Sequence, residues 1–205
     1  IDEHVATGLA RAEVLGNGVD TERFRPAPPS ASPAARPKPV VLFVGRFVPK
    51  KGFDLVAAAA GDDYEIAFAG GDRPPGVDDP RLRFLGAVAA EQMPAVYAGA
   101  DIMVVASVGE CPLTVLEAMA SGLPVLLRED PALHSPWTAG PGVRFVDMAA
   151  GELAGALREL VADPATMRRI GAEGRAHVET AYSWSAHLDR LEEAYRRVTP
   201  GSSPR

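Results

Sequence analysis

The sequence has 205 residues, of which 47% are hydrophobic and 23% charged, so the chain can form a sizeable core and is not expected to be disordered throughout. Its formal net charge is −6, from 21 basic and 27 acidic side chains, which disfavours a nucleic-acid-binding protein because that class usually carries a basic excess. The single cysteine, Cys111, excludes an intramolecular disulfide, and no apolar run is long enough to span a membrane, so we expect a cytoplasmic protein.

The first 39 residues are expected to precede the main domain. Residues 1–25 begin as a short amphipathic helix, with Val5 and Leu9 on its apolar face, and continue into a turn-rich segment. Residues 26–39 are rich in proline and alanine, a composition that favours an extended linker. Because the sequence starts with Ile1 rather than Met, we expect it to begin inside a longer parent protein.

From Val40 onward the sequence alternates between apolar, β-branched runs and helical patterns. The expected strands are 40–45, 64–71, 82–88, 101–107, 123–129 and 143–147. The expected helices are 53–61, 91–100, 111–122, 149–163, 164–182 and 183–198. This alternation predicts an α/β fold, a doubly wound parallel sheet in a Rossmann-like, three-layer domain over residues 40–199, with a tail at 200–205.

Ligands of such sheets bind beyond the carboxyl ends of the strands, at the strand-to-helix turns. That rule selects four turns: 45–52, 70–76, 86–91 and 106–113. In the first, "GRFVPKKG", Gly45 permits close backbone approach, and Arg46 offers five donors in a fork that suits phosphate oxygens. Lys51 stands at the start of the following helix, where an anion is also favoured. The turn is either a solvated basic loop or a cradle for an anionic ligand.

The fourth turn leads into an apolar helix with a carboxylate inside it. Pro112 suits the first helical position, and the amides of 113–115 (Leu113, Thr114 and Val115) would then point beyond the sheet. Glu117 interrupts the apolar run 115–120, and a buried carboxylate needs a hydrogen-bond donor. That donor is either a ligand hydroxyl or a structural partner in the protein.

Other polar residues give weaker signals. Glu110 lies in the loop before this helix and either reaches a ligand or is solvated. Cys111 lacks a histidine nearby in sequence, which disfavours a nucleophilic role. The four histidines do not have metal-ligand spacing, and we expect no metal site.

Taken together, these segments resemble the C-terminal half of the family-four (group 1) glycosyltransferases of the GT-B fold. The resemblance rests on "GNGVDTERFRP", "VVLFVGRFVPKKGFDLV", "YEIAFAGG", "LRFLGAV", "MPAVYAGADIMVVAS" and "GECPLTVLEAMASGLPV", in that order, and on the closing helix "YSWSAHLDRLEEAYRRV". The resemblance implies a domain that binds a nucleotide-sugar donor of the UDP or GDP type. It also implies sugar transfer with retention of configuration, without a metal and without a separate cofactor.

The resemblance implies a role for each matching position. Arg46 and Lys51 would be catalytic by holding the donor diphosphate, and Glu110, also catalytic, would contact the sugar hydroxyls. Glu117 would bind the ribose. The backbone of Gly86, Ala87 and Val88 would meet the base, and the amides of 113–115 would support the phosphates, with Gly45 beside them.

Five departures from the family pattern are visible. Six residues rather than seven lie between Glu110 and Glu117, "FG" of the motif is Pro112-Leu113, and Ala106 replaces a proline. A glycine-rich loop expected after the fifth strand is replaced by "REDPALHSPWTAGPG". The family's N-terminal, acceptor-binding domain is also missing, and it would be the main partner and the only route to a membrane.

Alternative functions remain open at this point. The irregular glutamate spacing favours a non-catalytic nucleotide-sugar-binding module. Another GT-B enzyme, such as a nucleotide-sugar epimerase, would share the same fold. A Rossmann NAD enzyme is disfavoured because G-x-G-x-x-G does not follow the first strand.

Overall fold

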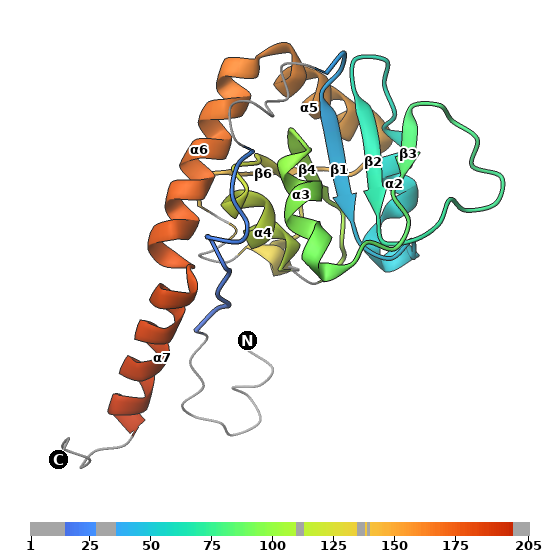
Figure 1. Cartoon of the computed structure of the whole chain (residues 1–205). Helices are drawn as coiled ribbons and strands as arrows, with labels where there is room; N and C mark the ends of the chain where they lie inside the picture. Colours follow the sequence, from blue (N-terminus) through green and yellow to red (C-terminus); the bar gives the residue numbers. More distant parts are fainter. Residues whose placement is uncertain (1–14, 28–35, 110–112, 135–137, 139, 199–205) are drawn as a thin grey trace.

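The computed structural model describes residues 15–27, 36–109, 113–134, 138 and 140–198, which contain a six-stranded sheet (Figure 1). The strands are β1 (Val40–Val44), β2 (Glu65–Ala69), β3 (Leu82–Phe84), β4 (Ile102–Val105), β5 (Val125–Arg128) and β6 (Val143–Val146). Their order is β3-β2-β1-β4-β5-β6, and every neighbouring pair is parallel. The predicted α/β fold with a doubly wound parallel sheet is confirmed.

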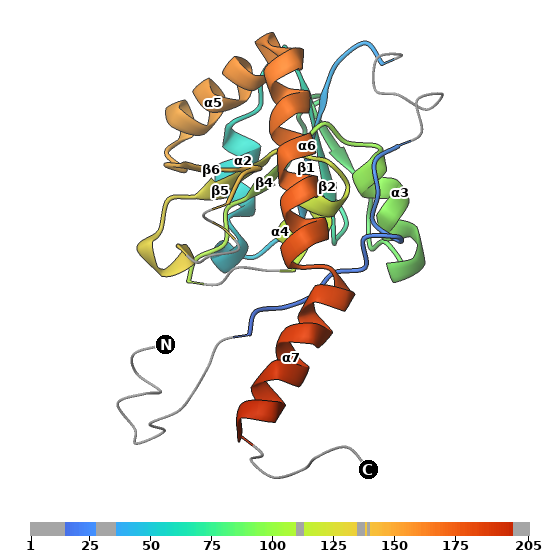
Figure 2. The ribbon, with the colours of Figure 1, turned by 90° about the vertical axis from the view of Figure 1, so that its left-hand side faces the viewer.

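Helices cover both faces of the sheet. α2 (Phe53–Ala58) and α5 (Ala150–Ala162) pack on one face, and α3 (Met93–Ala98) and α4 (Thr114–Ala120) pack on the other. α6 (Pro164–Ala181) lies against α4 and α5. Figures 1 and 2 show α7 (Trp184–Val198) following α6 and projecting away from the body of the domain.

The alternating direction of strand side chains divides the core into two halves. In β1, Val41 and Phe43 point toward α2 and α5, whereas Val40 and Leu42 belong to the cluster under α3 and α4. All four are buried, because helices cover both faces. Each such side chain stabilises the fold by about 1.5–3 kcal/mol relative to an exposed one.

The connection from β2 to β3, residues 70–81, contains no helix. Aromatic rings fill the space beside it: Phe68 stacks on Phe84 with ring centroids 5.3 Å apart, and Phe47 stacks on Phe53 at 4.7 Å. The guanidinium of Arg73 lies over the Phe84 ring, 5.2 Å from its centroid. Phenylalanine packing therefore replaces helix packing at this edge of the sheet.

The segment before the sheet is attached to the junction between α6 and α7. Val19 N–H donates to the Tyr182 carbonyl (2.9 Å), and Trp184 N–H donates to the Val19 carbonyl (3.2 Å). Phe24 is buried and meets Tyr97 edge to face at 5.6 Å. The predicted helix at residues 1–14 and the tail lie outside the described residues, as does most of the predicted linker.

Several helices and strands are shorter than the sequence predicts. The strand expected over 82–88 ends at Phe84, and the helix expected over 53–61 ends at Ala58. The strand expected over 82–88 cannot continue through Gly86, because the φ of +72° at that residue is incompatible with a strand. Within the described ranges, no helix combines the length and the apolar character needed to cross a bilayer.

The end of the 70–81 connection depends on one half-buried carboxylate, Asp79. Asp79 Oδ1 accepts hydrogen bonds from Arg81 N–H and Nε (both 2.9 Å), and Oδ2 accepts from Nη2 (2.6 Å). The side-chain hydrogen bond from Arg81, followed by the backbone one, lowers the pKa of Asp79 from 3.8 to about 2.

We therefore expect Asp79→Asn to lower the free energy of unfolding at neutral pH. A carboxylate whose pKa is lowered by folding stabilises the native state above its unfolded pKa, and that stabilisation disappears as the pH falls through the native value. The difference between wild type and Asp79→Asn should shrink from pH 4 toward pH 2 in urea unfolding. A difference that is unchanged over this range would contradict the assignment.

Candidate functional site

The carboxyl ends of β1, β2 and β3 are joined by backbone contacts between glycines. Gly45 N–H donates to the Ala69 carbonyl, and Gly70 N–H donates to the Gly86 carbonyl, both at 2.9 Å. All three glycines have positive φ, +153°, +132° and +72° in chain order. A Cβ at Gly70 would collide with the carbonyl oxygen of Gly45, so only glycine fits there. The backbones of Gly45, Gly70 and Gly86 thus form one continuous surface, here called the glycine floor, at the edge of the sheet where ligands are expected.

The first turn holds its basic residues against the end of β4. Gly52 has φ +71°, and a Cβ there would lie 2.7 Å from the carbonyl oxygen of Ala106. Val108 N–H donates to the Lys50 carbonyl at 3.0 Å. Arg46 is exposed and Lys51 half-buried, while Phe47 between them packs into the aromatic core. The predicted pair thus lies on a backbone fixed on both sides.

Glu117 has a protein partner that the sequence did not indicate. The Tyr97 hydroxyl donates to Glu117 Oε2 at 2.7 Å. Tyr97 is fully buried, so burial, with a further contribution from the Glu117 charge, raises the pKa of the phenol well above its ordinary value. Glu117 itself is half-buried. The hydrogen bond orients the carboxylate at the start of α4. The one sign of this partner in the sequence was a tyrosine, which carries a hydroxyl, within an otherwise apolar helix.

The start of α4 is only partly described. Leu113 is 47% exposed, and its carbonyl accepts from Glu117 N–H at 3.0 Å. The Thr114 hydroxyl is buried and, among the described residues, has no hydrogen-bond partner. Val115 faces the core. Glu110, Cys111 and Pro112 lie outside the described residues, so the predicted sugar contact of Glu110 stays a prediction.

The loop after β5 reaches the same edge. Gly109 N–H, the last described group before Glu110, donates to Asp130 Oδ2 at 3.3 Å. His134 stacks on Phe145 at 4.1 Å and pairs with Glu129 at 2.9 Å. Sequence reasoning did not predict the Asp130 contact, because nothing local in "REDPALHSPW" indicates a partner 21 residues upstream.

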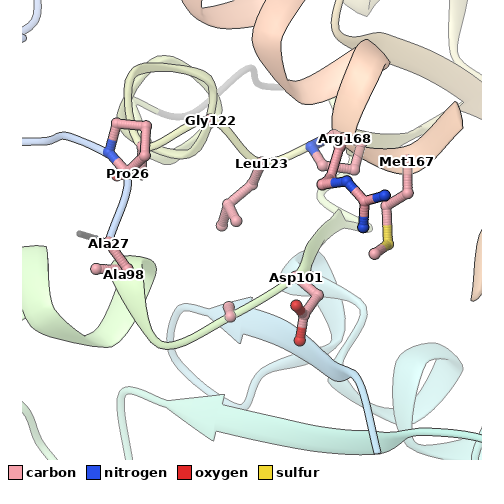
Figure 3. A pocket seen from close by; sticks show the side chains of 11 residues that line it. Pro26, Ala27, Ala98, Asp101, Gly122, Leu123, Met167 and Arg168 are labelled. Atoms are coloured by element: carbon pink, nitrogen blue, oxygen red, sulfur yellow. The ribbon is translucent and has the colours of Figure 1, made fainter. Parts of the chain in front are cut away.

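The pocket in Figure 3 lies elsewhere. It has a volume of about 190 Å³ and is lined by Pro26, Asp101, Leu123, Arg168 and their neighbours. Asp101 precedes β4 and Leu123 precedes β5, so this pocket lies at the amino ends of the strands. The glycine floor and the predicted site residues lie at the opposite ends. Over the described residues, no group of three or more His, Cys, Asp or Glu side chains could hold a metal ion.

Comparison with known proteins decides the family. Residues 38–163 match the sequence model described as "Glycosyl transferases group 1". This chain belongs to the group 1 glycosyltransferases. The predicted resemblance to the C-terminal half of that family is therefore confirmed, and a Rossmann NAD enzyme is set aside.

Two relatives illustrate how much of a group 1 glycosyltransferase is present. The chain is 31% identical to a GDP-mannose-dependent monoacylated alpha-(1-6)-phosphatidylinositol monomannoside mannosyltransferase of Corynebacterium glutamicum, over 87% of this chain and 54% of that protein. It is 30% identical to a D-inositol 3-phosphate glycosyltransferase of Rhodococcus opacus, over 96% of this chain and 50% of that protein. The chain spans about half the length of these relatives.

Solved structures agree with this assignment. Sucrose-phosphate synthase from Thermosynechococcus elongatus has a TM-score of 0.78 and 26% identity, over 96% of this chain and 56% of that one. A C-terminal domain of a group 1 glycosyl transferase (LpcC) from Francisella tularensis has a TM-score of 0.66 and 24% identity, over 82% of this chain and 100% of that one. The fold therefore recurs as a crystallised separate domain.

In this group 1 glycosyltransferase domain we expect Gly70→Ala to be severe. The new Cβ would collide with the Gly45 carbonyl and force a left-handed φ, so the free energy of unfolding should fall by at least about 3 kcal/mol. Gly76→Ala is the matched control, because Gly76 has φ +79° but open space around it; its cost should be about 1–2 kcal/mol. Equal losses in urea unfolding would show that the contact between the two turns does not constrain the fold.

Proposed function

We propose that this chain is the nucleotide-sugar-binding domain of a retaining, metal-independent glycosyltransferase that uses a UDP- or GDP-type donor. The observation that carries the proposal is the placement of Arg46, Lys51 and Glu117 at one edge of the sheet. They surround the glycine floor, where the backbone carries no side chains. The Corynebacterium relative is named as GDP-mannose-dependent, which supports a nucleotide-sugar donor.

The basic turn suits the diphosphate of the donor. Arg46 presents a planar fork that matches phosphate oxygens, and Lys51 supplies a second positive charge beside it. The amides of 113–115 at the start of α4 would support the same phosphates. As the bond from the sugar to the diphosphate breaks, negative charge grows on the leaving group. Fixed cations aimed at it would stabilise the transition state, which is why the proposed mechanism does not require a metal.

Glu117 suits the ribose of the donor. A carboxylate only accepts hydrogen bonds, and vicinal hydroxyls are suitable donors. Tyr97 occupies one oxygen of the carboxylate and fixes its direction, which leaves acceptor capacity for a ligand. Val88 packs on the same apolar cluster as Tyr97, so backbone at Gly86, Ala87 and Val88 is the neighbouring surface for the base.

The parent enzyme would need its other half to transfer the sugar. We propose that Glu110 contacts the sugar hydroxyls and that a separate N-terminal domain supplies the acceptor site, so this chain alone should not turn over. A non-catalytic binding module is the second candidate, because six residues rather than seven lie between Glu110 and Glu117. The two candidates differ in whether the intact parent transfers sugar.

Arg46→Ala and Lys51→Ala should each weaken GDP or UDP binding by about ten- to a hundredfold, because each removes a charge-assisted hydrogen bond to phosphate. Isothermal titration calorimetry measures this directly. Lys50→Ala is the matched control, because Lys50 lies in the same turn but is not assigned to the diphosphate, and its effect should be under about threefold. Equal weakening in all three variants, or no binding of either nucleotide by wild type, would contradict the proposed site.

A further inference from the structure

The turn after β2 carries a carboxylate, Asp72, that has no role in the proposed mechanism. We propose that Asp72 selects the base of the donor and that this base is guanine. The inference rests on the proposed function, since it requires a donor whose base lies against Gly86–Val88. It narrows the donor to a guanosine diphosphate type.

The backbone places Asp72 directly against the proposed base surface. The Gly70–Gly86 hydrogen bond (2.9 Å) and a β-bridge between Gly71 and Gly86 join the two turns. A Cβ built on Gly86 would lie 3.6 Å from Asp72 Oδ1, so the carboxylate stands over the backbone of that residue. Gly86 leaves this space open because it carries no side chain. A base lying on Gly86–Val88 would meet the carboxylate at its edge.

The Asp72 carboxylate is available to a ligand. Its side chain is exposed and, within the described part of the chain, makes no hydrogen bond or ion pair. The adjacent Arg73 does not neutralise it, because the Arg73 guanidinium lies over Phe84 and pairs with Asp78 Oδ1 at 3.4 Å. Asp72, Gly86 and Phe84 line a hollow of about 510 Å³. Arg73 and Arg83 also line it, but each pairs with another carboxylate, Arg73 with Asp78 and Arg83 with Glu65. The carboxylate is thus a charged acceptor at the wall of an open space.

The chemistry of the bases then decides between them. An ionised carboxylate has acceptors only, so it requires adjacent donors. Guanine offers two side by side, N1–H and the N2 amino group, and can form a bidentate, charge-assisted pair. Uracil offers one N–H between two carbonyl oxygens, which a carboxylate would repel. Adenine offers one amino group beside a ring-nitrogen acceptor. The Asp72 carboxylate therefore favours guanine and disfavours the other two bases.

The test is calorimetric titration of the 205-residue chain with GDP, UDP and ADP. Wild type should bind GDP at least about tenfold more tightly than UDP or ADP, because a bidentate pair replaces a repulsive contact. Asp72→Asn keeps the shape but replaces one acceptor oxygen by a donor, so GDP affinity should fall about tenfold while UDP affinity stays the same or rises. Asp63→Asn is the matched control, because Asp63 is another exposed aspartate, at the opposite end of β2, and its selectivity should equal that of wild type.

Two results overturn the inference while leaving the proposed function intact: UDP or ADP binding at least as tightly as GDP, or an unchanged GDP-to-UDP ratio in Asp72→Asn. Binding of none of the three nucleotides by wild type would overturn the proposed function, and the inference with it. A folded Asp72→Asn variant is expected because the residue is exposed, and its thermal unfolding curve verifies this.

Discussion

The contact between the backbones of Gly45, Gly70 and Gly86 is the constraint on which the ligand edge depends. In a parallel sheet the three turns leave neighbouring strands at the same edge, and side chains there would normally hold them apart. Here, two hydrogen bonds of 2.9 Å join the turns directly, and a Cβ at Gly70 does not fit between them. The result is a backbone surface without side chains at these three positions, with Arg46 in the first turn and Asp72 in the second.

The aromatic core and the site are parts of one arrangement. Phe47 lies in the same turn as Arg46 and stacks on Phe53. The aromatic packing that replaces a helix between β2 and β3 therefore also positions the basic turn. On the other face of the sheet, the buried Tyr97 orients Glu117. Burial on each face thus positions one polar group of the proposed donor site, a basic one from the first face and an acidic one from the second.

Periodicity was sufficient to predict the six strands, because runs such as Val40–Val44 are buried on both faces and carry a continuous apolar pattern. It was also sufficient to place Arg46, Lys51 and Glu117, since the edge rule for parallel sheets needs only the order of strands and helices. The sequence could not predict two contacts, the pairing of Tyr97 with Glu117 and that of Asp130 with Gly109. Each joins residues about 20 positions apart, and such contacts depend on the strand order, which local pattern does not determine.

Backbone amide shifts in two-dimensional NMR test most directly whether the donor binds at the glycine floor. On titration with GDP, the account predicts the largest shifts at Gly45, Gly70 and Gly86 and at the start of α4. Shifts concentrated instead at Gly122 and Leu123, beside the pocket at the amino ends of the strands, would contradict it.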